Sequence, residues 1–359
     1  MIYLDNAATT RPSTAAMAAF DASRNIFGNP SSLHSIGMAA EKELAKAREV
    51  LAKIINASPS EIFFTASGTE ANNLALFGGA KKHKGKRIVT SANEHSSVKE
   101  PLNKLSSKDG FEIHYLQKDG LQDALAEQTC LVAIHHVNSE TGEIQDICAM
   151  GSEIKRTSPA TLFHVDAIQS FCKIPIDVKK MQVDMLSMSA HKIGGFKGSG
   201  ALYVRNGVAL SPMILGGGQE GGLRSGTENV TGIMTFAASA EDFWKNTKAH
   251  NDHASALKSR FLQALGGVDG ISTNGENTSP YILNISVAGV RSQVLLNALS
   301  DKGVYISSGA ACSNNKRQKK ADEHAVRISF SHENTAEEID TAIALFIESI
   351  NSLRMTKYV

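Results

Sequence analysis

The chain has 359 residues, 42% hydrophobic and 20% charged, which is ordinary for a folded globular protein and enough for one large and one smaller domain. With 37 basic and 36 acidic residues, its formal net charge of +1 gives no electrostatic footprint for nucleic acid or an anionic membrane, so neither is expected as a direct partner. The opening residues MIYLDNAATT do not read as a signal peptide, and no run approaches about 18 apolar residues. We therefore expect no transmembrane helix and a cytoplasmic location.

The predicted elements alternate along the first part of the chain. Amphipathic stretches, such as a helix predicted around residues 142–157, separate several short apolar runs rich in β-branched residues. These runs predict strands over residues 87–92, 111–116, 130–137, 161–166, 185–190 and 201–205. Buried strands that alternate with helices are typical of an α/β domain with a mostly parallel sheet.

The alternation weakens after about Ser211, where a glycine-rich stretch, LGGGQEGGLRSGT, follows. The pattern then predicts one long helical segment from Val230 to Leu265. The remainder predicts a smaller α+β domain that ends in a helix over residues 334–353. Either Asn334 or Thr335 can cap the N-terminus of that helix.

Four cysteines occur, and none forms a C-x-x-C pair, so zinc-ribbon and thioredoxin-type sites are not supported and no metal is expected. Disulfides are not expected in a cytosolic chain of this size. Cys130, Cys148 and Cys172 lie in apolar contexts and are interpreted as buried small hydrophobes. Cys312 differs because its neighbours in SSGAACSNNK are small and polar. It is either a reactive thiol or an inert one.

The strongest local signal is SMSAHKIGGFKGSGALYV. A predicted strand brings Ser189, His191 and Lys192 to its C-terminal end, where ligands bind in open α/β sheets. Serine and histidine can bind an anion. A buried lysine has a lowered pKa, and its neutral amine can form an imine with a cofactor aldehyde. By itself, the motif also fits a surface lysine that follows a strand.

Three further motifs end predicted strands. In HVDAIQS, Asp166 could pair with the pyridine nitrogen of pyridoxal phosphate (PLP), which needs a carboxylate to stay protonated, or could cap a helix. In FFTASGTEANNLAL, Gly68 and Thr69 could present backbone N–H groups to a phosphate, or form a plain capped turn. The spacing matches neither common nucleotide-binding motif. In ANEHSSV, His95 could stack on a flat ring or move a proton, or be structural.

In this order on an α/β chain, the motifs resemble those of the cysteine desulfurases of the NifS/IscS type, in the class V aminotransferase-like branch of PLP enzymes. The resemblance runs nearly end to end, through YLDNAATT, FGNPSSLH, SGTEANN, EHSSV, VNSETG, HVDAIQS, SAHK, RSGT, SSGAACS and VRISF. It implies a fold type I PLP-dependent transferase. A large domain over 16–250 would hold a mostly parallel, seven-stranded-type sheet. A smaller α+β domain from 1–15 and 251–359 would carry the catalytic cysteine loop.

The resemblance also implies roles for single residues around the cofactor. Lys192 would be the Schiff-base lysine, Asp166 the partner of the pyridine nitrogen and Gln169 the partner of the ring's phenolic oxygen. His95 would stack over the ring. The phosphate ligands would be Gly68, Thr69, Ser189 and His191, with Thr227 of RSGT reaching the phosphate of the other subunit in a homodimer.

For the substrate, the resemblance implies that Arg327 of VRISF grips the carboxylate of L-cysteine, beside Asn138 and Ser139. Cys312 would attack the substrate sulfur, which leaves a persulfide on Cys312 and releases L-alanine. The persulfide would pass to a sulfur-acceptor protein, either a scaffold for iron–sulfur cluster assembly or a tRNA-thiolation enzyme. The alternatives are a related lyase, such as a selenocysteine lyase, and a catalytically weakened PLP protein that acts as a scaffold.

Two departures from the family pattern stand out. Ser139 occupies a position where the family usually has asparagine, and Asn138 could substitute for that amide. Between Cys312 and Arg327 lie 14 residues, fewer than in the family, which usually carries a short helical segment there. The stretch KRQKK in this region is interpreted as a solvated loop or as a docking patch for an acidic acceptor.

Overall fold

The computed structural model describes residues 1–116, 120–125, 129–309 and 323–355. Its internal contacts divide the chain into two units. The central unit comprises Arg11–Val137 and Gln145–Lys245, and the terminal unit comprises Met1–Thr10, Asn138–Ile144 and Asn246–Val359. Among the described residues, no helix is both long and apolar enough to cross a membrane.

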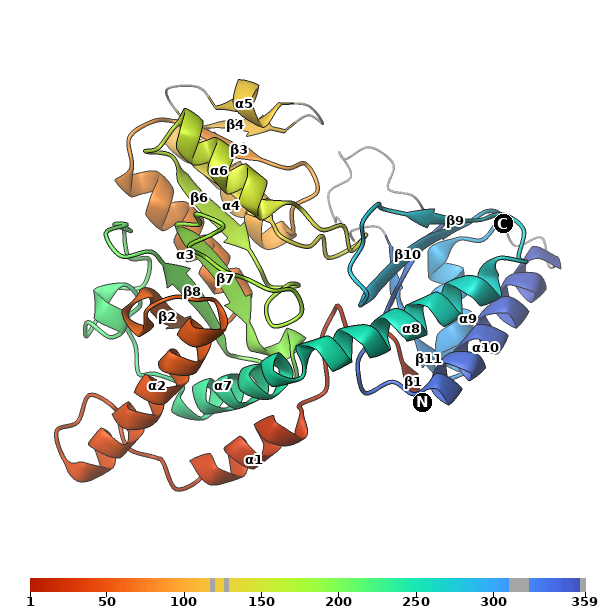
Figure 1. The fold of residues 1–359 in the computed structure, drawn as a ribbon, viewed down its shortest axis with the longest axis horizontal. Coiled ribbons are helices and arrows are strands. Elements are labelled where there is room, and N and C mark those ends of the chain that lie inside the picture. The colour runs from red at the N-terminus through yellow and green to blue at the C-terminus, as the bar shows by residue number, and fades with distance from the viewer. Residues whose placement is uncertain (117–119, 126–128, 310–322, 356–359) are drawn as a thin grey trace. The chain divides into compact units, whose positions relative to one another are not determined.

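The central unit is built on a seven-stranded sheet in the order β2-β8-β7-β6-β5-β3-β4 (Figure 1). The pairs from β7 through β6, β5 and β3 to β4 are parallel, and β8 pairs antiparallel with both β7 and β2. The strands are β2 Ile62–Thr65, β3 Arg87–Thr90, β4 Glu112–Tyr115, β5 Thr129–His135, β6 Leu162–Asp166, β7 Met185–Ser189 and β8 Gly200–Val204. The predicted α/β class with a mostly parallel sheet is confirmed.

Every residue of β5, β6, β7 and β8 is buried, because helices cover both faces of the sheet. The apolar residues of α3 and α4 form a core cluster with the sheet, and α1 and α2 both pack against α7. The helices of this unit are α1 Thr14–Ser23, α2 Ser35–Ile54, α3 Gly68–Lys82, α4 Ser96–Asp109, α5 Leu121–Ala124, α6 Ile147–Thr157 and α7 Val230–Lys245, with short 3-10 turns η1 Pro59–Glu61, η2 Ala190–Lys192 and η3 Glu220–Gly222.

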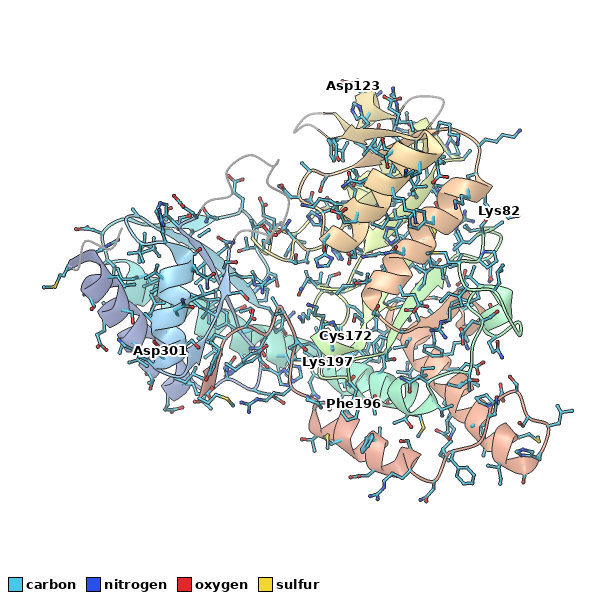
Figure 2. The ribbon with its side chains drawn as sticks, turned by 180° about the vertical axis from the view of Figure 1, so that it is seen from behind. Lys82, Asp123, Cys172, Phe196, Lys197 and Asp301 are labelled. Atoms are coloured by element: carbon cyan, nitrogen blue, oxygen red, sulfur yellow. The ribbon has the colours of Figure 1, made fainter. Side chains whose placement is uncertain are left out.

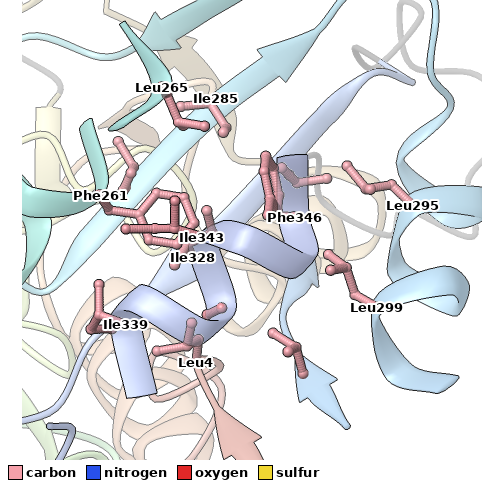
Figure 3. Packing of buried hydrophobic residues seen from close by; sticks show 14 of the residues in the cluster. Leu4, Phe261, Leu265, Ile285, Leu295, Leu299, Ile328, Ile339, Ile343 and Phe346 are labelled. Atoms are coloured by element: carbon pink, nitrogen blue, oxygen red, sulfur yellow. The ribbon is translucent and has the colours of Figure 1, made fainter. Parts of the chain in front are cut away.

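The terminal unit is the α+β arrangement that the sequence predicts. Its sheet has the order β12-β13-β10-β9, all antiparallel, while β1 pairs parallel with β11. Phe261, Phe346 and their apolar neighbours form its core (Figure 3). The elements are β1 Ile2–Tyr3, α8 Thr247–Leu265, β9 Ile271–Asn274, β10 Ile282–Val287, α9 Ser292–Asp301, β11 Val304–Tyr305, β12 Ser307–Ser308, β13 Ala325–Ser329 and α10 Ala336–Met355.

The N-terminus of α10 settles the predicted choice of cap. The Glu338 N–H donates to Thr335 Oγ1 (3.2 Å), and the Thr335 N–H donates to the Glu338 carboxylate (3.2 Å). This reciprocal pair is a capping box, so Thr335 is the N-cap residue and the helix begins at Ala336. Asn334 also binds the Glu338 carboxylate, through its side-chain amide (3.1 Å).

The single helix predicted from Val230 to Leu265 is wrong. Two helices occupy the segment, because Asn246 leaves the helical conformation (φ −108°, ψ 7°) between α7 and α8. Asparagine competes with the helical backbone for hydrogen bonds and so tolerates such a break. The division between the two units falls at the same residue. The predicted domain boundaries differ from this grouping mainly at residues 138–144, whose contacts lie with the terminal unit. The division of the chain into two separate domains stays a prediction.

Candidate active site

The parallel strands of the central sheet bring polar side chains to one edge. Asp166 is the last residue of β6, pairs in register with His135 at the end of β5, and has a neighbour in β7, which ends at Ser189. Ligands bind outside the carboxyl ends of strands in open α/β sheets. This edge is therefore where the fold provides a site.

A chain of hydrogen bonds leads from Asp166 to His95. Asn72, buried on α3, donates from its side-chain amide to the Asp166 carboxylate (2.8 Å) and to Ser97 Oγ (2.9 Å). Ser97 Oγ in turn lies 2.8 Å from His95 Nδ1, and the Ser97 backbone N–H donates to the same nitrogen (3.1 Å). Because Nδ1 accepts, the neutral imidazole of His95 carries its proton on Nε2.

Burial is the main cause of the pKa shifts of Asp166 and His95, the two ends of this series of hydrogen bonds. Burial raises the pKa of the Asp166 carboxyl, while hydrogen bonds from the Ile168 backbone N–H and from Asn72 act in the opposite direction. Burial lowers the pKa of His95; the Asp166 charge raises it and the Lys192 charge lowers it. His95 is therefore neutral at pH 7. No cationic side chain among the described residues forms an ion pair with Asp166, and a bound cation would supply this counter-charge.

Lys192 ends the 3-10 turn η2 that follows β7. Burial first, and then the charges of Lys192, Lys197 and Lys173, lower the pKa of His191 to about 4. Lys197 lies in the loop that follows η2 (Figure 2). Burial and the Lys192 charge lower the pKa of Lys173 to about 7. Burial and neighbouring positive charge thus disfavour the charged forms of both His191 and Lys173.

Three segments converge near the N-terminus of α3. A Cβ atom added to Gly68 would collide with Ile168 Cδ1 and lie 3.3 Å from Ser189 Cβ. Ser189 Oγ is buried and has no hydrogen-bond partner in the part of the chain that the structure describes. The first N–H groups of a helix have no partner within it, so α3 offers donors to an anion beside this hydroxyl. Thr69 is the next residue of α3 and is exposed.

These observations fit PLP, which carries both an anionic phosphate and a cationic ring nitrogen. The helix N-terminus and the Ser189 hydroxyl suit the phosphate, and the buried Asp166 carboxyl suits the protonated ring. Gln169 lies buried three residues after Asp166, and Thr227 is exposed in the loop between η3 and α7. Among the described residues, no group of histidine, cysteine and acidic side chains is arranged to hold a metal ion.

The terminal unit contains a second cluster, around Arg327 on β13. Its Nη1 donates to the Ser139 carbonyl (2.8 Å), and its Nη2 donates to the Asp5 carboxylate (2.8 Å). Asn138 closes the preceding turn, since its side-chain oxygen accepts from the N–H groups of Glu140 (2.8 Å) and Thr141 (2.9 Å). The structure thus joins Arg327 directly to Ser139, through the backbone of Ser139 rather than its hydroxyl.

Asn284 faces Arg327 across the β10–β13 ladder and is buried. Its amide donates to the carbonyls of Glu140 (3.0 Å) and Gly309 (2.9 Å), and its oxygen accepts from Asn274 (2.8 Å). Gly309 is the last residue described before Cys312, which lies outside the described residues together with the KRQKK stretch. Asn284 therefore ties the loop of Ser139 to the start of the segment that carries Cys312.

Sequence reasoning did not identify Asn72, Ser97, Asp5 or Asn284 as site residues. Asp5, Asn72 and Ser97 lie inside motifs that were assigned to other residues, whereas Asn284 lies outside every motif. Asn284 carries a recognisable signal, because it is the one amide in the buried strand β10, and a buried amide needs partners. Asn72 carries a weaker one, because Asn73 directly follows it on α3. Asp5 has no comparable local signal, since its partner is 322 residues away.

Several known proteins are similar to this chain along most of its length. The family model described as "Aminotransferase class-V" matches residues 2–342. "Cysteine desulfurase IscS" of Vibrio atlanticus (strain LGP32) is 42% identical, over 91% of this chain and 86% of its own. "NifS/IcsS protein homolog" of Lactobacillus delbrueckii subsp. bulgaricus is 39% identical, over 97% of each.

Two solved structures are also similar. The structure titled "NIFS-LIKE PROTEIN" superposes with a TM-score of 0.92 at 35% identity and covers 98% of this chain and 99% of its own. A structure titled "SspA in complex with cysteine" superposes with a TM-score of 0.79 at 31% identity and covers 93% of this chain and 100% of its own.

Proposed function

The chain belongs to the class-V aminotransferase family, and from this premise we propose that it is a PLP-dependent cysteine desulfurase that removes sulfur from L-cysteine and releases L-alanine. The observation that carries the proposal is the hydrogen-bonded chain from Asp166 through Asn72 and Ser97 to His95, within electrostatic range of Lys192. The names of the relatives support the same activity, and favour it over a selenocysteine lyase or a weakened scaffold protein.

The residues of the central unit would hold PLP as follows. Lys192 would bond covalently to its aldehyde carbon, Asp166 would face the ring nitrogen and Gln169 the phenolic oxygen. The phosphate would be bound by Gly68, Thr69, Ser189 and His191, with Thr227 supplied by a second copy of the chain. When bound, PLP supplies an electron sink for carbanion chemistry at the substrate.

The chain's own residues would place and move the protons. His95 is neutral, and its Nδ1 is held by Ser97, so it would present its Nε2–H to the site in one fixed orientation. Lys192 Nζ is the amine we assign to proton transfer at the substrate carbon. Asn72 would keep Asp166 pointed at the ring, because its amide bonds the carboxylate.

Arg327 would bind the substrate carboxylate, since a guanidinium donates paired hydrogen bonds to that group. The Cys312 thiolate would then attack the substrate sulfur. A sulfur–sulfur bond forms, the carbon–sulfur bond breaks with its electron pair left on the alanine fragment, and a proton completes L-alanine. The role of Cys312 rests on the motif SSGAACS, and a thiolate there requires a lowered pKa.

We also propose that the chain is a cytoplasmic homodimer that passes the persulfide sulfur to an acceptor protein, for iron–sulfur cluster assembly or tRNA thiolation. Large apolar side chains of the central unit are exposed in the single chain, among them Phe27 (78%), Leu33 (95%) and Leu215 (80%). Burial of such side chains against a second copy would stabilise a dimer. Sedimentation of the purified protein would test this proposal.

The decisive assay incubates the purified protein, supplied with PLP, with L-cysteine and a reductant, and measures alanine and sulfide. We expect the two products in equal amounts. Cys312→Ala should abolish persulfide formation, whereas the matched variant Cys148→Ala should not. Cys148 is exposed on α6, so its interpretation as a buried residue is wrong. The proposal is wrong if the wild-type chain forms no alanine. The role of Cys312 is wrong if its alanine variant releases sulfide at the full rate.

A further inference from the structure

Arg327 is already paired with a carboxylate of its own chain. The bond from Nη2 to Asp5 Oδ1 is 2.8 Å long, and the Arg327 and Asp5 side chains are 11% and 19% exposed. At such burial an ion pair is screened much less than on an open surface. The positive charge that would attract the substrate carboxylate is therefore largely compensated before substrate arrives.

The position of Asp5 is fixed by the backbone. Asp5 bridges to Ser329, the last residue of β13, and the Ser329 N–H donates to the Leu4 carbonyl (2.7 Å). The Ala7 N–H donates to Ser329 Oγ (2.9 Å). Arg327 lies two residues before Ser329, so the two side chains share one face of the strand. Asp5 is thereby held beside Arg327 by contacts that do not depend on the ion pair.

The pairing still leaves Arg327 able to bind a second carboxylate. A guanidinium has five N–H groups, and the structure shows one used by the Ser139 carbonyl and one by Asp5. Nε is buried and has no partner among the residues described. The remaining donors suffice for a bidentate grip on a substrate carboxylate, which would then share the guanidinium with Asp5.

We propose that Asp5 is a positioning and specificity residue that lowers the affinity of the Arg327 site for carboxylates. It orients the guanidinium while cancelling much of its charge. The site then binds a zwitterionic amino acid such as L-cysteine, releases L-alanine readily and disfavours a ligand with a second negative charge. This inference rests on the proposed function, in which Arg327 binds the substrate carboxylate.

The test is Asp5→Asn in the loaded enzyme, with the inhibition constant of L-alanine and the KM of L-cysteine as readouts. Asparagine can still accept the bond from Nη2 but lacks the charge. Both constants should fall at least about fivefold, the factor that two unit charges about 4 Å apart produce even at the dielectric constant of water. A smaller fall, no change or a rise in the alanine constant overturns the inference.

Asp340→Asn is the matched control, because it removes one acidic charge from the same unit at an exposed ion pair with Arg260. It should leave both constants unchanged, and a fall equal to that of Asp5→Asn would assign the effect to overall charge and overturn the inference. A purely structural role of the Asp5 pair would raise KM in Asp5→Asn rather than lower it.

A measurement on the wild-type enzyme decides the matter if Asp5→Asn does not fold. Inhibition by L-alanine is compared with inhibition by L-alaninamide, which lacks the carboxylate charge. With Arg327 compensated, the carboxylate should improve binding by less than about tenfold, roughly the net contribution of one ordinary hydrogen bond between uncharged groups. A larger preference overturns the inference. A wild-type enzyme that makes no alanine from cysteine would instead refute the proposed function, which separates the two failures.

Discussion

The clusters of the two units are organised by different forces. In the central unit, neutral hydrogen-bond donors hold the buried Asp166 and the solvent-exposed His95 at the carboxyl edge of a parallel sheet. In the terminal unit, an ion pair and a backbone carbonyl hold Arg327 on an antiparallel sheet. In the central unit, the buried Asp166 carboxylate would gain from a bound cation. In the terminal unit, Asp5 already pairs with the Arg327 guanidinium. We therefore expect the central cluster to bind its ligand tightly and the terminal cluster to exchange its ligand readily.

The largest expected effect is the loss of the Asp166 charge. Asp166→Asn keeps the shape but removes the counter-charge for a protonated ring. It also keeps an acceptor for only one of the two N–H groups, of Asn72 and Ile168, that donate to the carboxylate. The rate of alanine formation should fall at least about 100-fold, because a preorganised electrostatic partner contributes about 10²–10³ in kcat. Steady-state kinetics at saturating PLP measure this fall in the rate of alanine formation. A loss of tenfold or less would show that Asp166 does not face the reacting group.

The next effect concerns Asn72, whose side-chain amide connects Asp166 to Ser97 and through it to His95. Asn72→Ala leaves Asp166 and Ser97 without their shared donor, and a buried group left unpaired costs about 1–3 kcal/mol. Urea unfolding of the protein without PLP should show that loss. Asn73→Ala is the matched control, since the half-buried Asn73 amide on the same helix bonds only backbone carbonyls in the described residues, those of Thr69 (2.9 Å) and Ser97 (3.4 Å), and does not contact the Asp166 carboxylate. Equal losses in the two variants would contradict a special role for Asn72.

Acid should destabilise the central unit. Burial lowers the pKa of His164 to about 3 and that of His136 to about 4, both below the ordinary value of 6.5. A folded-state pKa below the unfolded one means that the stabilising neutral form is present above pH 6.5 and is lost as the pH falls toward 4. Each imidazole should cost roughly 2 kcal/mol at pH 5 relative to pH 7.

His164→Gln tests the predicted loss of stability in acid, with the free energy of unfolding measured at pH 7 and pH 5. The variant should lose less stability between the two pH values than the wild-type chain does. His83→Gln is the control, because His83 bonds the Ala209 carbonyl near the surface and its change should leave the pH dependence as it was. An unchanged pH dependence in His164→Gln would rule out His164 as a source of acid lability.

The smallest effect lies in the terminal unit. Thr335→Ala removes the cap of α10 and should lower the free energy of unfolding by about 1 kcal/mol. Chemical denaturation measures this loss. Thr341→Ala serves as control, because Thr341 lies inside the helix and its hydroxyl donates to the Glu337 carbonyl one turn earlier (2.8 Å). A larger loss in Thr341→Ala than in Thr335→Ala would contradict the assigned cap.

The fold follows from the sequence wherever one local pattern decides an element. The apolar runs at residues 161–166 and 185–190 predict β6 and β7 almost to the residue, because strands buried on both faces are apolar throughout. The break at Asn246 escapes prediction because apolar residues recur at helical spacing on both sides of it. Which core each helix packs on is decided by tertiary contacts, and periodicity does not record them.

The site divides in the same way. Asp166, His95 and Lys192 follow predicted strands and carry motifs of a known family, so the sequence singles them out. Asn72 is recognisable afterwards as a buried amide with partners. Asp5 is not, because its bond to Arg327 joins residues 322 positions apart, and no local pattern encodes such a contact.

The central claim is that Lys192 is the lysine that bonds PLP. Reduction of the loaded protein with borohydride, followed by peptide mapping by mass spectrometry, tests it directly. Lys173 is the informative competitor, because it is buried in the same unit and its pKa is lowered to about 7. We predict that the pyridoxyl group is attached to Lys192. A label on Lys173, or on any other lysine in place of Lys192, would contradict the account.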